Sequence, residues 1–90
     1  MLKTLEDLVH IIRDRKSSSD DTSYTAKLLK DKSLSVEKVK EEVGELIEAV
    51  ENNSNKVHEA ADVLYHLLVY LEGNGVRIED IMDELEKRKK

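Results

Sequence analysis

The sequence contains no cysteine, proline, tryptophan or phenylalanine among its 90 residues. Without cysteine, disulfide bonds and cysteine-ligated zinc sites are excluded. Aromatic side chains, which favour strands, are limited to three tyrosines. Together with the absence of proline, this composition favours an all-α fold over a β-sheet.

Excess basic charge and long apolar runs are also missing. Asp and Glu number 20 against 15 Lys and Arg, so the net charge is −5, and we expect no nucleic-acid partner, which would need a basic face. No apolar run approaches the roughly 20 residues that span a bilayer. Acidic residues interrupt the apolar pattern at the N-terminus, which argues against a signal peptide. We therefore expect no membrane partner and a cytoplasmic location.

Apolar residues recur at helical spacing along most of the chain, and polar or glycine-containing stretches separate these segments. No repeat or linker divides the chain, so residues 1–90 are expected to form a single domain. In the first part of the chain we predict a helix ending near Lys16 with Thr4 as its cap, a loop over 17–22, a short helix over 23–30 and a polar joint over 31–35. A long helix over 36–52 and a second long helix over 55–72, capped by Ser54 or Asn55, are predicted to follow. The chain is then expected to form a turn over 73–75 and a last amphipathic helix that begins near Ile78.

The two long helices differ in how their apolar residues are distributed. On helix 36–52 the valines, Leu46 and Ile47 lie on one side, a stripe of Glu41, Glu45 and Glu48 lies on the other, and Glu42 lies on the flank between them. Helix 55–72 is apolar almost all round and is predicted to be the central element, covered on several sides. Because one chain this short offers few partners, we infer a homodimeric helical bundle built around a hairpin of the two long helices.

Four polar residues interrupt the apolar surface of helix 55–72, namely Asn55, Glu59, Asp62 and His66. A carboxylate in such surroundings is costly unless a basic side chain or a metal ion compensates its charge. If Glu59 and Asp62 face acids of helix 36–52 across the hairpin, like-charge repulsion would raise the pKa of some of them. Mg²⁺, which prefers oxygen ligands, would relieve this repulsion.

A plainer interpretation applies to part of this pattern. A glutamate-rich run such as residues 41–48 is by itself more typical of a solvated helix face than of a ligand set. Glu59 and Asp62 favour function, because acids are unusual on a helix that is otherwise apolar. His66 is interpreted as a core histidine with a satisfied hydrogen bond rather than as a metal ligand.

Two short motifs carry a resemblance to known enzymes. EEVGE at 41–45 and EAAD at 59–62 resemble the E-E-x-x-E and E-x-x-D signature of the MazG-like all-α nucleotide pyrophosphohydrolases. SYTAKLL at 23–29, KVKEEVGE at 38–45 and EAADVLYHLLVYL at 59–71 are more specifically similar to the phosphoribosyl-ATP pyrophosphohydrolase family of histidine biosynthesis. The similarity extends over residues 5–88.

The resemblance implies Mg²⁺-dependent hydrolysis of phosphoribosyl-ATP to phosphoribosyl-AMP and pyrophosphate, with Mn²⁺ as a substitute for Mg²⁺. The chain departs from the family pattern beside the expected substrate pocket, where KDKS at 30–33 lacks a glycine and Lys40 replaces another. Carried over by position, the resemblance assigns Glu42, Glu45, Glu59 and Asp62 to the metal, Glu41 or Glu42 to catalysis as the proton acceptor, and Ser23, Tyr24, Thr25, Lys27, Lys38 and Arg88 to the substrate.

Two alternatives stay open at this level. A MazG-like pyrophosphohydrolase could act on another nucleoside triphosphate, since the carboxylate motif identifies only the superfamily. A non-catalytic helical dimer, with its acidic stripe merely solvated, would show the same periodicity.

Overall fold

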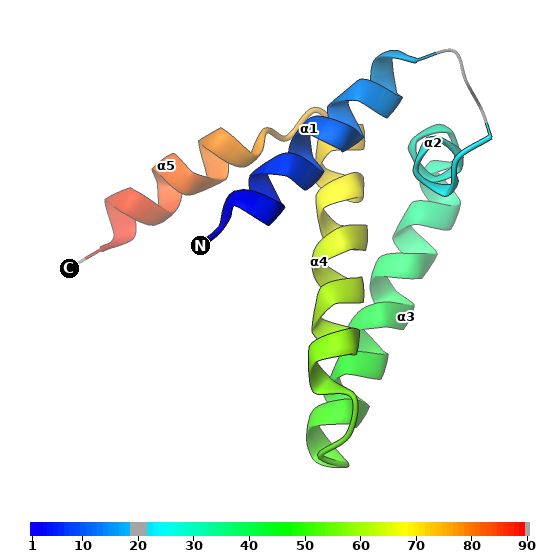
Figure 1. The fold of residues 1–90 in the computed structure, drawn as a ribbon, viewed down its shortest axis with the longest axis vertical. Helices are drawn as coiled ribbons and strands as arrows, with labels where there is room; N and C mark the ends of the chain where they lie inside the picture. The colour runs from blue at the N-terminus through cyan, green and yellow to red at the C-terminus, as the bar shows by residue number, and fades with distance from the viewer. Residues whose placement is uncertain (19–21, 90) are drawn as a thin grey trace.

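The computed structural model describes residues 1–18 and 22–89, and the described part of the chain is all-helical (Figure 1). This confirms the predicted fold class. The helices are α1 (Lys3–Ser17), α2 (Tyr24–Lys30), α3 (Lys32–Glu51), α4 (Lys56–Gly73) and α5 (Ile78–Arg88). The predicted loop over 17–22 lies partly outside the described residues, and its first residue, Ser17, ends α1.

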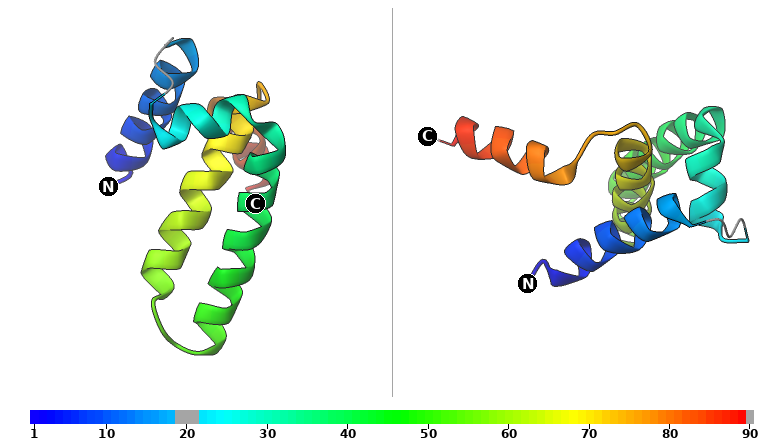
Figure 2. Two further views of the ribbon diagram at one scale, coloured as in Figure 1. Left: turned by 90° about the vertical axis from the view of Figure 1, so that its right-hand side faces the viewer. Right: turned by 90° about the horizontal axis from the view of Figure 1, so that it is seen from above.

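The helices α3 and α4 form an antiparallel hairpin, which is the longest feature of the molecule (Figures 1 and 2). They are joined through residues 52–55, where Asn53 and Asn55 adopt left-handed backbone angles with φ of 53° and 51°. Asparagine tolerates this region better than most residues. Helix α4 ends where predicted, because Gly75 takes a φ of 76° and lets the chain turn toward α5.

Several predicted helix ends are wrong in detail. Thr4 lies inside α1, which begins at Lys3 and has no side-chain cap. Asn55 stands at the start of α4, but its left-handed backbone leaves its side chain without a capping bond. The polar joint predicted over 31–35 shrinks to Asp31, whose carboxylate accepts a hydrogen bond from Leu34 N at 3.0 Å and so starts α3 early. An aspartate in this position satisfies an amide that has no partner within the helix.

Helix α4 is the central element, as predicted, since α1, α2, α3 and α5 all contact it. The core lies where α1 and α2 cover the C-terminal half of α4 (Figure 2). The buried core residues are Val9, Ile12, Leu28, Leu68 and Val69.

The far half of the hairpin is covered on fewer sides. The side of α3 that faces inward carries Ser35, Glu42 and Ala49, which are buried. On the valine-rich side of α3, Val36, Val39 and Leu46 are half-buried, whereas Ile47 and Val50 are 54% and 56% accessible to solvent. On this half of the hairpin, therefore, part of the apolar surface is left uncovered.

An arginine joins α1 to the end of α4 and the start of α5. Arg13 donates to both carboxylate oxygens of Glu72, at 3.0 and 2.9 Å, and to Glu79 at 2.8 Å. The hydrogen bonds from Arg13 lower the pKa of Glu79 to about 2 and also lower the pKa of buried Glu72. These contacts attach the start of α5 to α1 and to the end of α4. From this point α5 extends away from the hairpin (Figure 1). No described helix is both long enough and apolar enough to cross a membrane.

Candidate active site

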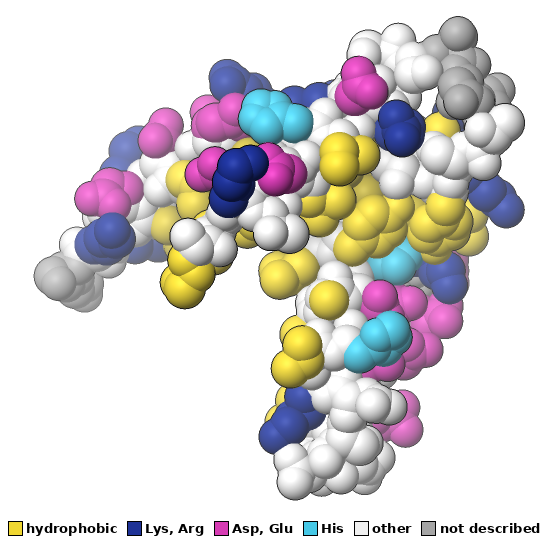
Figure 3. All heavy atoms as spheres, in the orientation of Figure 1, with side chains coloured by type: hydrophobic (Ala, Val, Ile, Leu, Met, Phe, Trp, Pro, Cys, Tyr) yellow, Lys and Arg dark blue, Asp and Glu magenta, His cyan; other side chains and the backbone are white. Residues whose placement is uncertain are grey.

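Acidic side chains of α3 and α4 gather on one side of the hairpin, where Figure 3 shows a continuous acidic patch. On α3, carboxylate oxygens of Glu41, Glu42 and Glu45 lie within 4.8 Å of one another. Both helices place their acids at spacings of three or four residues, which stack side chains on one helix face. Each helix thus presents its own cluster of oxygen atoms.

The two clusters face each other across the hairpin. Burial raises the pKa of Glu42, and the charges of Glu45 and Asp62 raise it further. Burial likewise raises the pKa of Glu59, and Glu45 is again the next cause. Glu45 on α3 therefore acts on carboxylates of both helices. The structure brings together the four acids that the sequence proposed as metal ligands, and their mutual repulsion favours protonation or a bound cation.

Two oxygen atoms at this site fit the binding of a cation. Glu42 Oε2 and Glu59 Oε2 are buried, and neither has a hydrogen-bond partner in the described structure. Buried polar atoms are almost always paired, and leaving one unpaired costs about 1–3 kcal/mol. One orphan oxygen comes from each helix, so a hard divalent cation between them would satisfy both. Carboxylate oxygens are the ligands that Mg²⁺ prefers.

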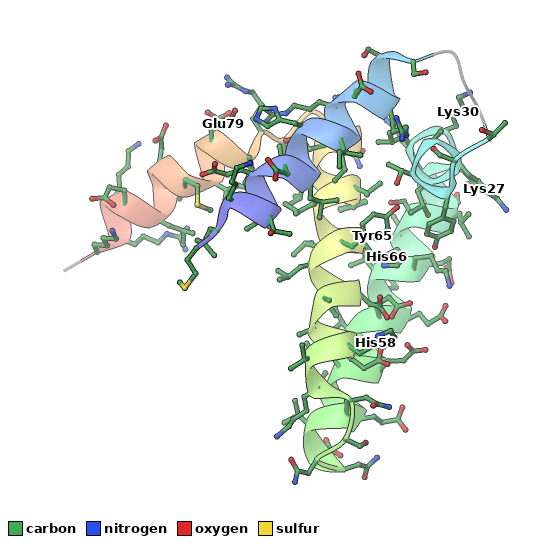
Figure 4. The ribbon with its side chains drawn as sticks, in the orientation of Figure 1. Lys27, Lys30, His58, Tyr65, His66 and Glu79 are labelled. Carbon is green, nitrogen blue, oxygen red and sulfur yellow. The ribbon has the colours of Figure 1, made fainter. Side chains whose placement is uncertain are left out.

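His58 was not predicted to take part in this site. Its Nε2 lies 3.4 Å from an oxygen of Asp62, one turn further along α4. His58, Glu59 and Asp62 each offer one ligand atom within 4.8 Å of the others. Figure 4 shows His58 on the side of α4 that faces α3. The signal was present in the sequence, because residues 58 and 62 are spaced i, i+4 on one helix face.

A chain of hydrogen bonds connects this site to α2. His66 Nδ1 donates to the backbone oxygen of Asp62 at 2.8 Å, and Nε2 lies 3.0 Å from the hydroxyl of Tyr24. Because the Asp62 carbonyl can only accept, neutral His66 carries its proton on Nδ1 and Nε2 accepts from Tyr24. This agrees with the interpretation of His66 as a hydrogen-bonded core histidine. The imidazole thereby fixes Tyr24 next to the acidic clusters.

Residues of α2 proposed to contact substrate are held by the same helix pair. Thr25 is hydrogen-bonded through its hydroxyl to that of Tyr65 on α4. Ser23 caps α2 by accepting from Ala26 N at 3.0 Å, so part of its hydroxyl is committed to the fold. Tyr24 and Lys27 line a cavity of about 830 Å³ at the α2–α3 junction. The structure therefore groups four of the six proposed substrate residues on α2 and its cap.

The other two proposed substrate residues belong to other helices, and the charge of one of them, Lys38, acts on Tyr24 of α2. Lys38 is on α3, one turn before the acids, where its Nζ is 3.5 Å from Glu41 Oε2. The charge of Glu41 raises the pKa of Lys38. Arg88 is on the last turn of α5, paired with Glu84 at 3.0 Å. Because α5 extends away from the hairpin, Arg88 is not brought to the acidic clusters of the same chain (Figure 1).

Comparison with known proteins decides the family. The family described as phosphoribosyl-ATP pyrophosphohydrolase matches residues 5–89. The chain belongs to the phosphoribosyl-ATP pyrophosphohydrolase family. A phosphoribosyl-ATP pyrophosphatase of Methylobacterium nodulans is 48% identical over 88 residues, covering 94% of this chain and 82% of the relative. A phosphoribosyl-ATP pyrophosphatase of Methanosarcina acetivorans is 42% identical, covering 97% of this chain and 88% of the relative.

Longer members of the phosphoribosyl-ATP pyrophosphohydrolase family carry additional sequence. A histidine biosynthesis bifunctional protein of Arabidopsis thaliana, described as chloroplastic, is 41% identical over 95 residues. The alignment covers 97% of this chain but only 34% of that protein. No solved structure matches the chain. The family resemblance carried by residues 23–29, 38–45 and 59–71 is confirmed.

Proposed function

We propose that this protein hydrolyses phosphoribosyl-ATP to phosphoribosyl-AMP and pyrophosphate in histidine biosynthesis. The observation that supports this most directly is the convergence of acids from α3 and α4, with one unpaired buried oxygen on each helix, in a chain that belongs to this family. The acids account for catalysis of phosphoanhydride hydrolysis only if a cation joins them, since a negatively charged site alone would repel a triphosphate.

We propose that Glu42, Glu45, Glu59 and Asp62 hold Mg²⁺, with Mn²⁺ able to replace it. A bound divalent cation would supply neutralisation of phosphate charge and would acidify water. Glu42 and Glu59 contribute the two unpaired oxygens. His58, whose imidazole is mostly exposed, is close enough to Asp62 to orient its carboxylate.

The remaining polar residues divide the other tasks. Glu41, the alternative to Glu42 as proton acceptor, is more exposed than Glu42 and pairs only at 3.5 Å with Lys38. We propose that Glu41 accepts the proton of the attacking water, because Glu42 is buried among the proposed metal-ligand atoms. Lys38 lies 3.5 Å from Glu41, and its ammonium can neutralise charge on the departing pyrophosphate.

We further propose that the active form is a homodimer or a larger homo-oligomer. Hydrophobic side chains line the side of α4 opposite the acidic patch (Figure 3). Several exposed apolar side chains on one side of a helix are typical of an interaction surface. The large apolar side chains that are exposed on the hairpin include Val43, Ile47 and Val50 of α3 and Val57, Leu64 and Leu67 of α4.

The proposed activity is tested by incubating the pure protein with phosphoribosyl-ATP, with and without Mg²⁺, and measuring pyrophosphate release. We expect turnover that requires the cation and that is lost in Glu59→Gln and Asp62→Asn. Glu48→Gln, an exposed acid on α3, is the matched control and should remain active. Turnover confined to a panel of ordinary nucleoside triphosphates would instead favour the broader MazG-like activity. No turnover, with no Mg²⁺-dependent stabilisation, would favour a non-catalytic helical dimer.

A further inference from the structure

The cavity at the junction of α2 and α3 has a charge opposite to that of the rest of the molecule. Lys27 and Lys30 of α2 and Lys32 of α3 line its volume of about 830 Å³. Figure 4 shows Lys27 and Lys30 at the outer side of α2. Three cations within six residues are concentrated here in a chain whose net charge is −5. This local field would attract an anion. We name this pocket the lysine cavity.

Few of the described residues that line the lysine cavity carry negative charge. Among the described residues, Asp31 is the one acid that lines it, and its carboxylate accepts the capping bond from Leu34 N. Lys27 and Lys32 take part in no ion pair within residues 1–18 and 22–89. The wall also includes the hydroxyl groups of Ser23 and Ser33, which can donate to phosphate oxygens.

The lysine cavity and the acidic clusters are neighbours, with Tyr24 between them. Tyr24 lines the cavity on one side, while its hydroxyl reaches His66, which in turn bonds the backbone of Asp62. Burial raises the pKa of the Tyr24 hydroxyl, the charge of Lys38 lowers it, and the charges of Glu42 and Glu41 raise it, so these three charged groups of α3 lie near Tyr24. A ligand that extends past the side chain of Tyr24 would therefore have one end at the acidic clusters and the other end in the lysine cavity.

We propose that the lysine cavity binds the phosphate of the phosphoribosyl group, the end of the substrate that is not hydrolysed. This inference rests on the proposed function. In phosphoribosyl-ATP the triphosphate and the phosphoribosyl phosphate are attached on different sides of the adenine, so the two anionic groups need two separate sites. The ammonium group of lysine binds phosphate directly as a point charge, so this site needs no metal ion. An ordinary nucleoside triphosphate lacks the phosphoribosyl phosphate, so the lysine cavity selects for substrates that carry this additional group.

The test compares two triple variants with the same loss of charge. One is Lys27→Gln, Lys30→Gln and Lys32→Gln. The control removes exposed lysines elsewhere, by Lys3→Gln, Lys56→Gln and Lys87→Gln. Ribose 5-phosphate is the probe for the cavity, and its affinity is measured by calorimetric titration in EDTA, so that the acidic site takes no part. We expect the cavity variant to bind the probe at least about tenfold more weakly than wild type, because charge-assisted bonds to phosphate are lost, whereas the control keeps its affinity.

Activity gives the second readout. The kcat/KM for phosphoribosyl-ATP should fall about tenfold or more in the cavity variant, and the affinity for Mg²⁺–ATP should stay close to that of the control. Equal probe affinity in both variants, or equal losses for both nucleotides, would overturn the proposal. All three lysines are exposed, and circular dichroism checks that both variants fold. Lys27→Gln alone provides a milder version of the same test.

The two proposals fail in different ways. Wild-type protein that hydrolyses phosphoribosyl-ATP while the cavity variant binds ribose 5-phosphate normally would contradict the lysine cavity alone. Wild-type protein that binds the probe through these lysines but does not hydrolyse phosphoribosyl-ATP would support the phosphate site and contradict the proposed function.

Discussion

Glu42 offers the sharpest test of how the acidic site is balanced, because its side chain is buried while its charge is uncompensated. Glu42 is only 7% exposed to solvent, and its Oε2 atom has no hydrogen-bond partner in the described structure. Glu42→Gln keeps the shape of the side chain and removes the charge. In the absence of a divalent cation, we expect this substitution to stabilise the protein, which is opposite to the usual effect of a change at a buried position.

The size of the effect follows from the contacts. A buried acceptor without a partner costs about 1–3 kcal/mol, and the amide of glutamine can donate to the carboxylate of Glu45. Allowing for imperfect geometry, we expect a gain of about 1 kcal/mol in the free energy of unfolding. For a domain of this size, 1 kcal/mol corresponds to an increase in Tm of about 4–8 °C.

The gain should depend on pH. Burial and then the charge of Glu45 raise the pKa of Glu42 above its ordinary value of 4.5. As pH rises above 4.5 the unfolded chain releases this proton while the folded chain retains it, so the metal-free wild type loses stability until the pH passes the folded pKa. At lower pH the carboxyl group is protonated in both states. Glu42→Gln should therefore exceed wild type clearly at pH 7.5 and only slightly at pH 4.

Thermal unfolding followed by circular dichroism provides the assay, first in EDTA and then in Mg²⁺. At Mg²⁺ tenfold above its Kd, wild type should gain about 1.4 kcal/mol by mass action, and Glu42→Gln should gain less. Glu48→Gln is the control, since this glutamate is exposed on the same helix. A lower Tm for Glu42→Gln in EDTA at pH 7.5, or an undiminished response to Mg²⁺, would refute the reasoning.

Three further predictions concern the surroundings of the site. Arg13 lowers the pKa of Glu79 to about 2. The stabilisation from this pair is therefore present above pH 4.5 and is lost as the pH falls toward 2. In Glu79→Gln, the Tm should change less with pH between 4.5 and 2 than it does in wild type. Tyr24→Phe removes the bond to His66 and should raise KM for phosphoribosyl-ATP while lowering stability by only about 1 kcal/mol; an unchanged KM would argue against the positioning role. Leu64→Glu places a charge on the exposed face of α4 and should yield monomers in sedimentation, whereas monomeric wild-type protein at micromolar concentration would contradict the dimer.

The sequence by itself determined the features that depend on neighbouring residues. Helical spacing of apolar side chains located the two long helices and the last amphipathic helix, because one face of a helix repeats about every 3.6 residues. Gly75 marked the turn after α4, since its positive φ is costly for other residues. Spacing within α3 and within α4 also placed the acids of each helix together.

Only the tertiary structure decided how the faces of different helices meet. Periodicity put Glu42 on the flank of α3, but the packing of α4 buries it and leaves Ile47 and Val50 exposed. The short helix α2 reaches α4 through Tyr24 and His66, which are 42 residues apart in the chain. Such contacts depend on the angle and register of whole helices, which the sum of many weak packing interactions sets. The local pattern of a single sequence carries no direct record of that sum.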